Sequence, residues 1–135
     1  LFSIDTTWLT QTLDAGRKVV LFTQSPILMA HKNLTCMPTL THNKQDNWPM
    51  VFSELYKLGV HGVLVEGGSS VFTSILSTQY FDALWIFKTP DVLDPKTAVP
   101  FIQSNDTSYT KNLVVDKVEP CEQDVLTQYK NIHAI

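Results

Sequence analysis

The sequence predicts an α/β fold in which helices connect the strands of a largely parallel sheet. Apolar runs of strand length, helical spacing between them and a closing pair of strand patterns support this prediction. Because strand–helix–strand connections are nearly always right-handed parallel crossovers, the middle of the chain predicts a layered α/β sandwich. Its alternating strand and helix segments are residues 18–23, 46–59, 62–66, 69–76 and 83–87.

The predicted strands are apolar runs without alternation, as is typical of strands that are covered on both faces. Residues 18–23 form such a run, and residues 83–87 form another, which ends before Pro90. Residues 1–4 and 31–37 are shorter candidates. Together they predict several strands in one central sheet.

A second strand pattern closes the chain after a loop-rich stretch over residues 91–108. Residues 113–115 and 125–129 are strand-like, and residues 119–122 between them suit a hairpin. We therefore expect an antiparallel pair at the C-terminal edge of the sheet.

The clearest helix pattern lies in the middle of the chain. Asp46 or Asn47 can cap this helix, Pro49 suits its first turn and Gly59 provides a stop. Residues 8–16, in contrast, are compatible with one or two helical turns or with an irregular loop. The apolar positions of the clear helix are Trp48, Val51, Phe52, Leu55 and Leu58.

The amino-acid composition of the chain excludes several classes of function. The chain has 135 residues, of which 44% are hydrophobic, so we expect one domain with its own core over residues 1–135. No apolar run approaches the roughly 20 residues that a membrane span needs. The ten Lys and Arg residues are scattered and the net charge is −3, so nucleic acid is not the expected partner. Isolated Cys36 and Cys121, with no signal-peptide pattern, predict a cytoplasmic protein.

One segment has a pattern that suits ligand chemistry. Residues 62–66 predict a buried strand that leads through Gly67 and Gly68 into a helix, which Ser69 or Ser70 can cap. Glycines let a ligand approach the backbone, and the first helical turn offers N–H donors and partial positive charge to a phosphate. From spacing alone two interpretations stay open, a tight turn, which is the commoner case, or a phosphate-binding turn.

Glu66 stands at the end of that predicted strand, beside the glycine turn. At the rim of a cleft its carboxylate could accept hydrogen bonds from a substrate, or hold a proton if it is desolvated. It could equally accept from backbone N–H groups of its own turn. The residues by themselves leave both interpretations open.

The other residues with reactive side chains form no recognised pattern. The histidines show no metal-ligand spacing with Cys36 or Cys121, so no metal site is expected. No serine lies in a GxSxG elbow. The sequence therefore identifies no catalytic nucleophile, acid or base.

The glycine segment resembles a known family, the C-terminal reductase domain of the bacterial riboflavin-biosynthesis deaminase/reductase. The resemblance rests on Val65-Glu66-Gly67-Gly68-Ser69, on Phe81-Asp82-Ala83-Leu84-Trp85-Ile86 and on Pro90. The family has an apolar strand ending in V-E-G-G, a helix, and then a hydrophobic-D-E-L segment that leads into a strand and a proline. Weaker matches are Phe2-Ser3-Ile4-Asp5-Thr6 and Glu122-Gln123-Asp124-Val125.

The resemblance implies a dihydrofolate-reductase-like fold, a three-layer sandwich with a mostly parallel central sheet and an antiparallel C-terminal edge. It also implies a homodimeric NADPH-dependent reductase. Such an enzyme reduces the ribosyl group of 5-amino-6-(5-phosphoribosylamino)uracil, a phosphorylated pyrimidine, to a ribityl group. By the same resemblance, Glu66 would face the substrate and Thr6 would stand at a cofactor-contacting hydroxyl position. The cofactor phosphates would lie against Gly67, Gly68, Ser69, Ser70 and Val71.

The sequence also departs from the family pattern. Asp91-Val92-Leu93-Asp94 follows Pro90 where the family has a nearby glycine, and Arg17 is the one arginine available for phosphate groups. The family's opening section, with a Lys-bearing strand and a Ser-Leu-Asp-Gly-like turn, does not precede Leu1. We therefore expect the C-terminal portion of a reductase domain, with weak or no activity by itself.

Two other functions stay open from the sequence. The same fold could serve as a non-catalytic module for cofactor binding or dimerisation. Alternatively, the chain could be an unrelated α/β domain in which the Gly67-Gly68 turn arose by chance.

Overall fold

The computed structural model describes residues 6–25, 29–38, 44–94, 96–102 and 108–133, so the strand predicted over residues 1–4 lies outside the described residues. The chain divides into two compact units. Unit 1 comprises residues 1–42 and unit 2 comprises residues 43–135.

Helix α1 (Thr6–Asp14) begins the described part of unit 1. It buries Leu9 and Leu13, which lie four residues apart and therefore on one face of the helix. Gly16 follows with a φ of +80°, and its N–H donates to the carbonyl oxygen of Leu13 at 3.0 Å. Of the two alternatives for residues 8–16, the helix is the one that forms.

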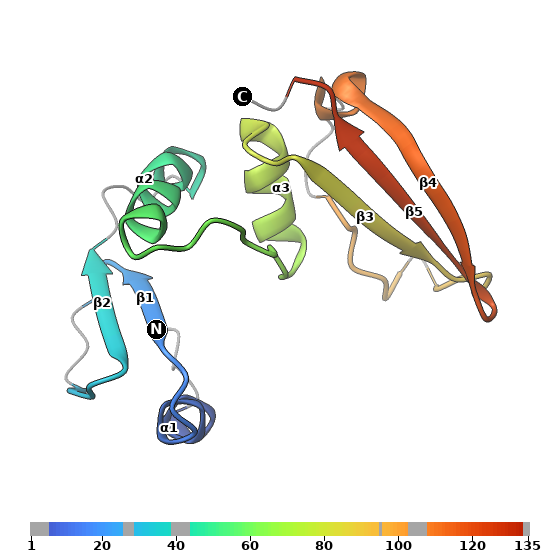
Figure 1. Cartoon of the computed structure of the whole chain (residues 1–135). Coiled ribbons are helices and arrows are strands. Elements are labelled where there is room, and N and C mark those ends of the chain that lie inside the picture. Colours follow the sequence, from blue (N-terminus) through green and yellow to red (C-terminus); the bar gives the residue numbers. More distant parts are fainter. Residues whose placement is uncertain (1–5, 26–28, 39–43, 95, 103–107, 134–135) are drawn as a thin grey trace. The chain divides into compact units, whose positions relative to one another are not determined.

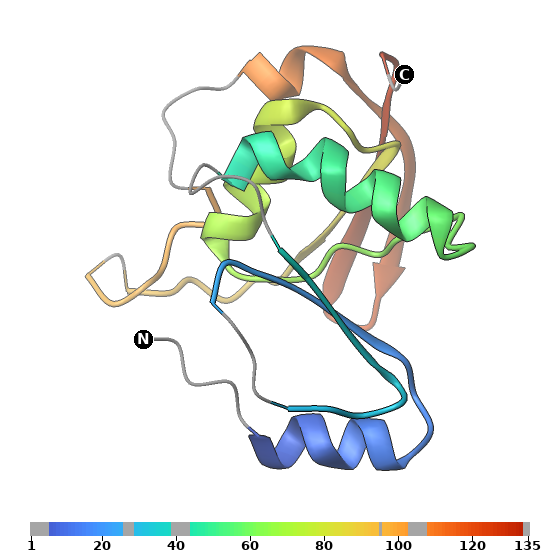
Figure 2. The same cartoon turned by 90° about the vertical axis from the view of Figure 1, so that its left-hand side faces the viewer.

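Strands β1 (Val19–Thr23) and β2 (Leu34–Pro38) form a two-stranded parallel sheet. The register places Val19 opposite Leu34 and Thr23 opposite Pro38. Figure 1 shows the two strands side by side, and Figure 2 shows them nearly edge-on. The apolar run over residues 18–23 is thus confirmed as a strand, whereas the strand predicted over residues 31–37 begins only at Leu34.

Helix α2 (Lys44–Lys57) is the first element of unit 2. It begins before Asp46 and Asn47, so the prediction that one of them caps it is wrong. Pro49 lies inside the helix, where it lacks an N–H and gives up one helical hydrogen bond. Because α2 begins at Lys44, Pro49 is its sixth residue and lies beyond the first four N–H groups, which have no helical partner in any case, so the prediction that Pro49 lies in the first turn is wrong. Gly59, at a φ of +81°, follows the helix as predicted.

Helix α3 (Ser69–Thr78) follows the glycine turn. Its N-cap is Gly68, which makes no side-chain cap hydrogen bond, so the prediction of a Ser69 or Ser70 cap is wrong. The reason is geometric: Gly68 is still extended, at φ −80° and ψ 177°, whereas both serines are already helical. At the other end Gln79 adopts a left-handed conformation with a φ of 59°.

The larger sheet consists of β3 (Ala83–Lys88), β4 (Leu113–Cys121) and β5 (Asp124–Asn131), in the antiparallel order β3-β5-β4. A 3₁₀ helix (Ser108–Asn112) leads into β4, and a bulge interrupts the β4–β5 register between Val115 and Lys117. The predicted antiparallel C-terminal edge is confirmed. Its hairpin turn lies at Glu122 and Gln123, slightly later than predicted.

Helix α3 lies against one side of this sheet, and helix α2 packs beside α3 (Figure 1). The buried centre consists of Ile75 and Leu76 from α3 and Leu84 from β3. Partly buried side chains surround this centre: Trp48, Phe52, Val65, Phe72, Phe81, Ile86, Ile102, Tyr109, Leu113 and Tyr129.

The strand predicted over residues 62–66 does not form. None of the described strands pairs with this segment, and the Leu64 side chain is 78% exposed. A strand requires a hydrogen-bonded neighbour, and apolar composition alone does not supply one. Among the described residues the strands form a two-stranded parallel sheet and a three-stranded antiparallel sheet. The mostly parallel central sheet stays a prediction.

Candidate functional site

The turn before helix α3 is open beside the N-terminal end of the helix. The backbone of Gly68 is extended at φ −80° and ψ 177°, a conformation that any residue can adopt. A Cβ atom built on Gly68 would meet no atom within 4 Å. Gly68 therefore borders open space at the N-terminal end of a helix, where the helix dipole favours negative charge.

Gly67 is constrained in a different way. A Cβ atom here would lie 2.9 Å from the Cβ atom of Val71 in the first turn of α3. The absence of a side chain at Gly67 thus allows the chain to pass close to its own helix. The two glycines therefore differ. Packing against Val71 requires a residue without a side chain at position 67, whereas a side chain at position 68 would meet no neighbouring atom.

The first turn of α3 is fixed by main-chain bonds to Gly68. The carbonyl oxygen of Gly68 accepts from the N–H of Val71 at 2.9 Å and from the N–H of Phe72 at 3.2 Å. Ser69 and Ser70 occupy the first two helical positions with half-buried side chains. The N–H of Val71 therefore already has a partner within the chain.

Contacts with neighbouring elements hold α3 in place. The indole Nε1–H of Trp48 on α2 donates to the hydroxyl oxygen of the buried Ser74 at 3.1 Å. Trp48 also stacks on Phe52, with ring centroids 5.5 Å apart. On the other side, the ring of Phe72 lies 4.9 Å from that of Phe101. The helix that carries the turn is therefore anchored on two sides.

Glu66 lies immediately before the turn with an exposed side chain. Within the described part of the chain, no donor contacts its carboxylate. The sequence left open whether the Glu66 carboxylate accepts hydrogen bonds from its own turn or from a substrate. Among the described residues, no N–H group of its own turn donates to this carboxylate. The carboxylate is exposed to solvent and accessible to a ligand.

Glu66, Gly67, Gly68, Ser69, Ser70 and Val71 are thus consecutive around one turn, as the sequence implied. Thr6 belongs to unit 1, where it is the first residue of α1 and has an exposed side chain. In the ranges that the structure describes, no three His, Cys, Asp or Glu side chains gather as a possible metal site.

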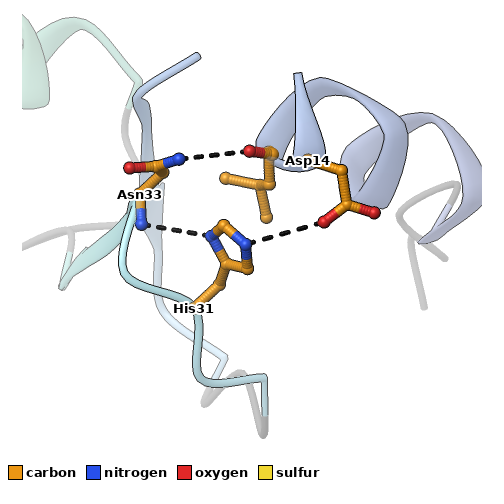
Figure 3. Close-up of polar contacts among 4 residues, drawn as sticks. Asp14, His31 and Asn33 are labelled. Atoms are coloured by element: carbon orange, nitrogen blue, oxygen red, sulfur yellow. Dashed lines mark hydrogen bonds and ion pairs between the residues drawn. The ribbon is translucent and has the colours of Figure 1, made fainter. Parts of the chain in front are cut away.

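A polar cluster in unit 1 had no sequence signal (Figure 3). The Nδ1 atom of His31 accepts from the N–H of Asn33 at 3.1 Å, and its Nε2 atom lies 3.7 Å from a carboxylate oxygen of Asp14. Because Nδ1 is an acceptor, the ring proton of neutral His31 is on Nε2, facing Asp14. The Asn33 amide donates to the carbonyl oxygen of Leu13 at 3.1 Å. This cluster ties the end of α1 to the segment before β2.

The family model of the RibD C-terminal domain matches residues 3–127 of the 135 residues. The chain belongs to the RibD C-terminal domain family. The resemblance to the riboflavin-biosynthesis reductases is thereby confirmed. No curated protein matches the sequence.

Solved structures share the fold of this RibD C-terminal domain. The riboflavin biosynthesis reductase Rib7 of Saccharomyces cerevisiae has a TM-score of 0.70 at 13% identity, covering 96% of this chain and 59% of that one. The deaminase/reductase of Thermotoga maritima has a TM-score of 0.64 at 24% identity, covering 84% and 31%. A pyrimidine reductase-like protein of Corynebacterium diphtheriae has a TM-score of 0.61 at 22% identity, covering 82% and 49%.

These likenesses establish an α/β fold similar to that of RibD-type reductases. The chain spans between about a third and three fifths of the length of the three solved proteins. No helix in the described ranges is both long and apolar enough to cross a membrane.

Proposed function

We propose that this chain is the C-terminal portion of an NADPH-dependent reductase domain of riboflavin biosynthesis. Its substrate would be 5-amino-6-(5-phosphoribosylamino)uracil, whose ribosyl group is reduced to ribityl. The family match over residues 3–127 spans both compact units, which supports treating residues 1–135 as parts of one domain. The solved neighbours include a protein described as a 5-amino-6-(5-phosphoribosylamino)uracil reductase.

The observation that supports cofactor binding best is the open space at Gly68. A Cβ atom at this position would occupy space that a phosphate can enter, while nothing in the fold requires glycine there. A helix N-terminus binds phosphate through its N–H groups and dipole without needing arginine. The residues present therefore suit the pyrophosphate of a dinucleotide, with Gly67, Gly68, Ser69, Ser70 and Val71 around it. A cofactor-contacting role of Thr6 rests on the family resemblance alone.

NADPH supplies the hydride for this reaction when it is bound. The chain's own contribution is positioning: the α3 turn holds the phosphates, and the anchoring of α3 through Ser74 and Phe72 keeps that turn in place. The exposed Glu66 carboxylate would accept hydrogen bonds from substrate N–H or O–H groups beside the turn. No residue is assigned as the proton donor.

The resemblance also implies a cellular location and an oligomeric state, and we propose both for this protein. We place the protein in the cytoplasm, where this pathway supplies its substrate, and we expect it to act as a homodimer. The three-layer arrangement of a complete reductase domain stays a prediction.

The test is a titration of NADPH into the protein and into two matched variants, followed by calorimetry. Gly68→Val fills the open space at the turn, and Gly62→Val makes the same change at a glycine that also has no neighbour within 4 Å. We expect Gly68→Val to abolish binding and Gly62→Val to preserve it. Unchanged binding by Gly68→Val, or no binding by the unmodified protein at millimolar cofactor, would contradict the cofactor assignment.

The alternative function is a non-catalytic module that binds the cofactor or dimerises. This chain covers only 31% to 59% of the lengths of the solved reductases, so it need not contain all the residues that catalysis requires. This observation favours the alternative. Absorbance at the nicotinamide band separates the two: a reductase oxidises NADPH when substrate is added, whereas a module binds NADPH without oxidising it.

A further inference from the structure

An exposed aromatic ring lies beside the first turn of α3. The ring centroids of Phe72 and Phe101 are 4.9 Å apart, and their planes are tilted by 41°. Phe72 is the fourth residue of α3, whereas Phe101 belongs to the segment between β3 and the 3₁₀ helix. Figures 1 and 2 both show this segment passing beside α3. The ring pair therefore brings a distant part of the chain to the helix that carries the glycine turn.

Phe72 lies one helical turn after Gly68. The N–H of Phe72 donates to the carbonyl oxygen of Gly68 at 3.2 Å, and residues four apart are neighbours on a helix surface. Helical side chains lean back toward the N-terminal end, so the Phe72 ring leans toward the turn. No atom of either ring lies within 4 Å of a Cβ atom built on Gly68. The ring pair thus adjoins the turn and leaves the space beside Gly68 unfilled.

Phe101 is held in place and is nevertheless accessible. The next residue, Ile102, packs against the buried centre of unit 2, which fixes the backbone at this point. Phe101 itself stays 45% exposed, and Val99 two residues earlier is 76% exposed. Apolar surface that folding leaves in water gains free energy when a ligand covers it. The Phe101 ring is therefore an apolar surface available to a ligand beside the turn.

We infer that a heteroaromatic ring of the bound dinucleotide stacks on Phe101 while the phosphates of that dinucleotide occupy the turn before α3. A dinucleotide carries a planar ring on each side of its pyrophosphate, so a ligand held at the turn brings such a ring to its surroundings. Stacking of a base on an aromatic side chain strengthens binding by roughly fivefold to a hundredfold. The inference rests on the cofactor binding proposed above and identifies a further residue that contacts the same ligand.

Calorimetric titration of NADPH into the unmodified protein and two matched variants tests this contact. We expect Phe101→Ala to weaken NADPH binding at least about fivefold. Phe87→Ala is the control, because Phe87 is also an exposed phenylalanine, at 63%. Its neighbour Ile86 packs against the core under α3, so Phe87 points to the other face of the sheet. We expect Phe87→Ala to bind NADPH as the unmodified protein does.

Two further variants separate stacking on the ligand from bracing of α3. Phe101→Tyr retains a flat ring and should bind NADPH with nearly unchanged affinity. Phe101→Leu retains an apolar contact with Phe72 but has no flat ring, so it should bind NADPH as weakly as Phe101→Ala does. Inorganic pyrophosphate, measured as a competitor of NADPH, probes the turn alone. Its affinity should be the same for Phe101→Ala and for the unmodified protein.

A fragment of the cofactor identifies which ring stacks. ADP-ribose carries the adenine and the pyrophosphate but no nicotinamide. If Phe101→Ala weakens ADP-ribose as much as it weakens NADPH, the adenine is the ring on Phe101. If Phe101→Ala weakens NADPH alone, the ring is the nicotinamide.

NADPH binding that Phe101→Ala weakens no more than Phe87→Ala does would overturn this inference. Restored binding in Phe101→Leu, or a parallel loss of pyrophosphate affinity in Phe101→Ala, would also overturn it, since Phe101 would then only brace the helix. Each of these results leaves NADPH bound to the unmodified protein, so the cofactor turn would stand. Absence of NADPH binding by the unmodified protein would contradict both proposals, and the two failures are therefore distinguishable.

Discussion

The side-chain amide of Asn131 donates to the carbonyl oxygen of Phe81 at 3.0 Å, and it also donates to that of Gln79 at 3.2 Å. Asn131 is the last residue of β5 and is 6% exposed, whereas Gln79 and Phe81 lie between α3 and β3. The main-chain N–H of Asn131 adds a bond to Asp82 at 2.9 Å. One buried side chain thus fixes the connection between the helix and the sheet.

Replacement of Asn131 by alanine should therefore destabilise the fold. Two carbonyl oxygens would lose their buried donor, and we expect a loss of about 2 to 3 kcal/mol in the free energy of unfolding, measured with urea. Asn131→Asp retains the acceptor for the N–H of His133 but loses the donors, so it should cost at least as much. The exposed control Lys111→Ala should stay within about 0.5 kcal/mol. Equal stabilities for Asn131→Ala and the control would argue against this role.

The bond between Trp48 and Ser74 is expected to stabilise the anchoring of α3. Trp48→Phe removes the Nε1–H that donates to the Ser74 hydroxyl, at an expected cost of about 1 kcal/mol. A double-mutant cycle with Ser74→Ala measures the interaction itself. If the two substitutions were fully additive in urea unfolding, the hydrogen bond would contribute nothing to stability.

The two glycines of the turn should respond differently to alanine. Gly67→Ala forces a Cβ atom against Val71, and we expect it to cost about 1 to 3 kcal/mol. Gly68→Ala has open space and an ordinary backbone conformation, so thermal unfolding should show little change. In a Val71→Ala background the Gly67→Ala penalty should shrink. A penalty of the same size in both backgrounds would place its cause elsewhere.

The hairpin turn contains a residue in a strained conformation. Glu122 has a φ of +56° at the first position of the two-residue turn between β4 and β5. Left-handed backbone costs a residue with a Cβ atom about 1 to 2 kcal/mol, so Glu122→Gly should raise the free energy of unfolding by about 1 kcal/mol. Gln123→Gly, at the neighbouring position without a positive φ, is the control and should bring no such gain.

Local patterns by themselves determined much of this protein. The apolar run over residues 18–23, the helical spacing after Trp48 and the Gly67-Gly68 turn each predicted an element or a turn that the structure contains. The V-E-G-G segment also identified the family, because a motif depends on residue order alone. Side-chain periodicity and glycine placement act over a few residues, so they are visible without the fold.

Only the tertiary structure decided which segments of the chain pair or pack with one another. Residues 62–66 have strand composition, yet whether a strand forms depends on a hydrogen-bonding neighbour distant in sequence, which composition does not specify. The contrast between Gly67 and Gly68 depends on where Val71 lies, and the exposure of Trp85 depends on which face α3 covers. His31 and Asp14, 17 residues apart, meet only because α1 and the segment before β2 pack together. Contacts between segments distant in the chain arise from packing, and packing is a property of the folded molecule.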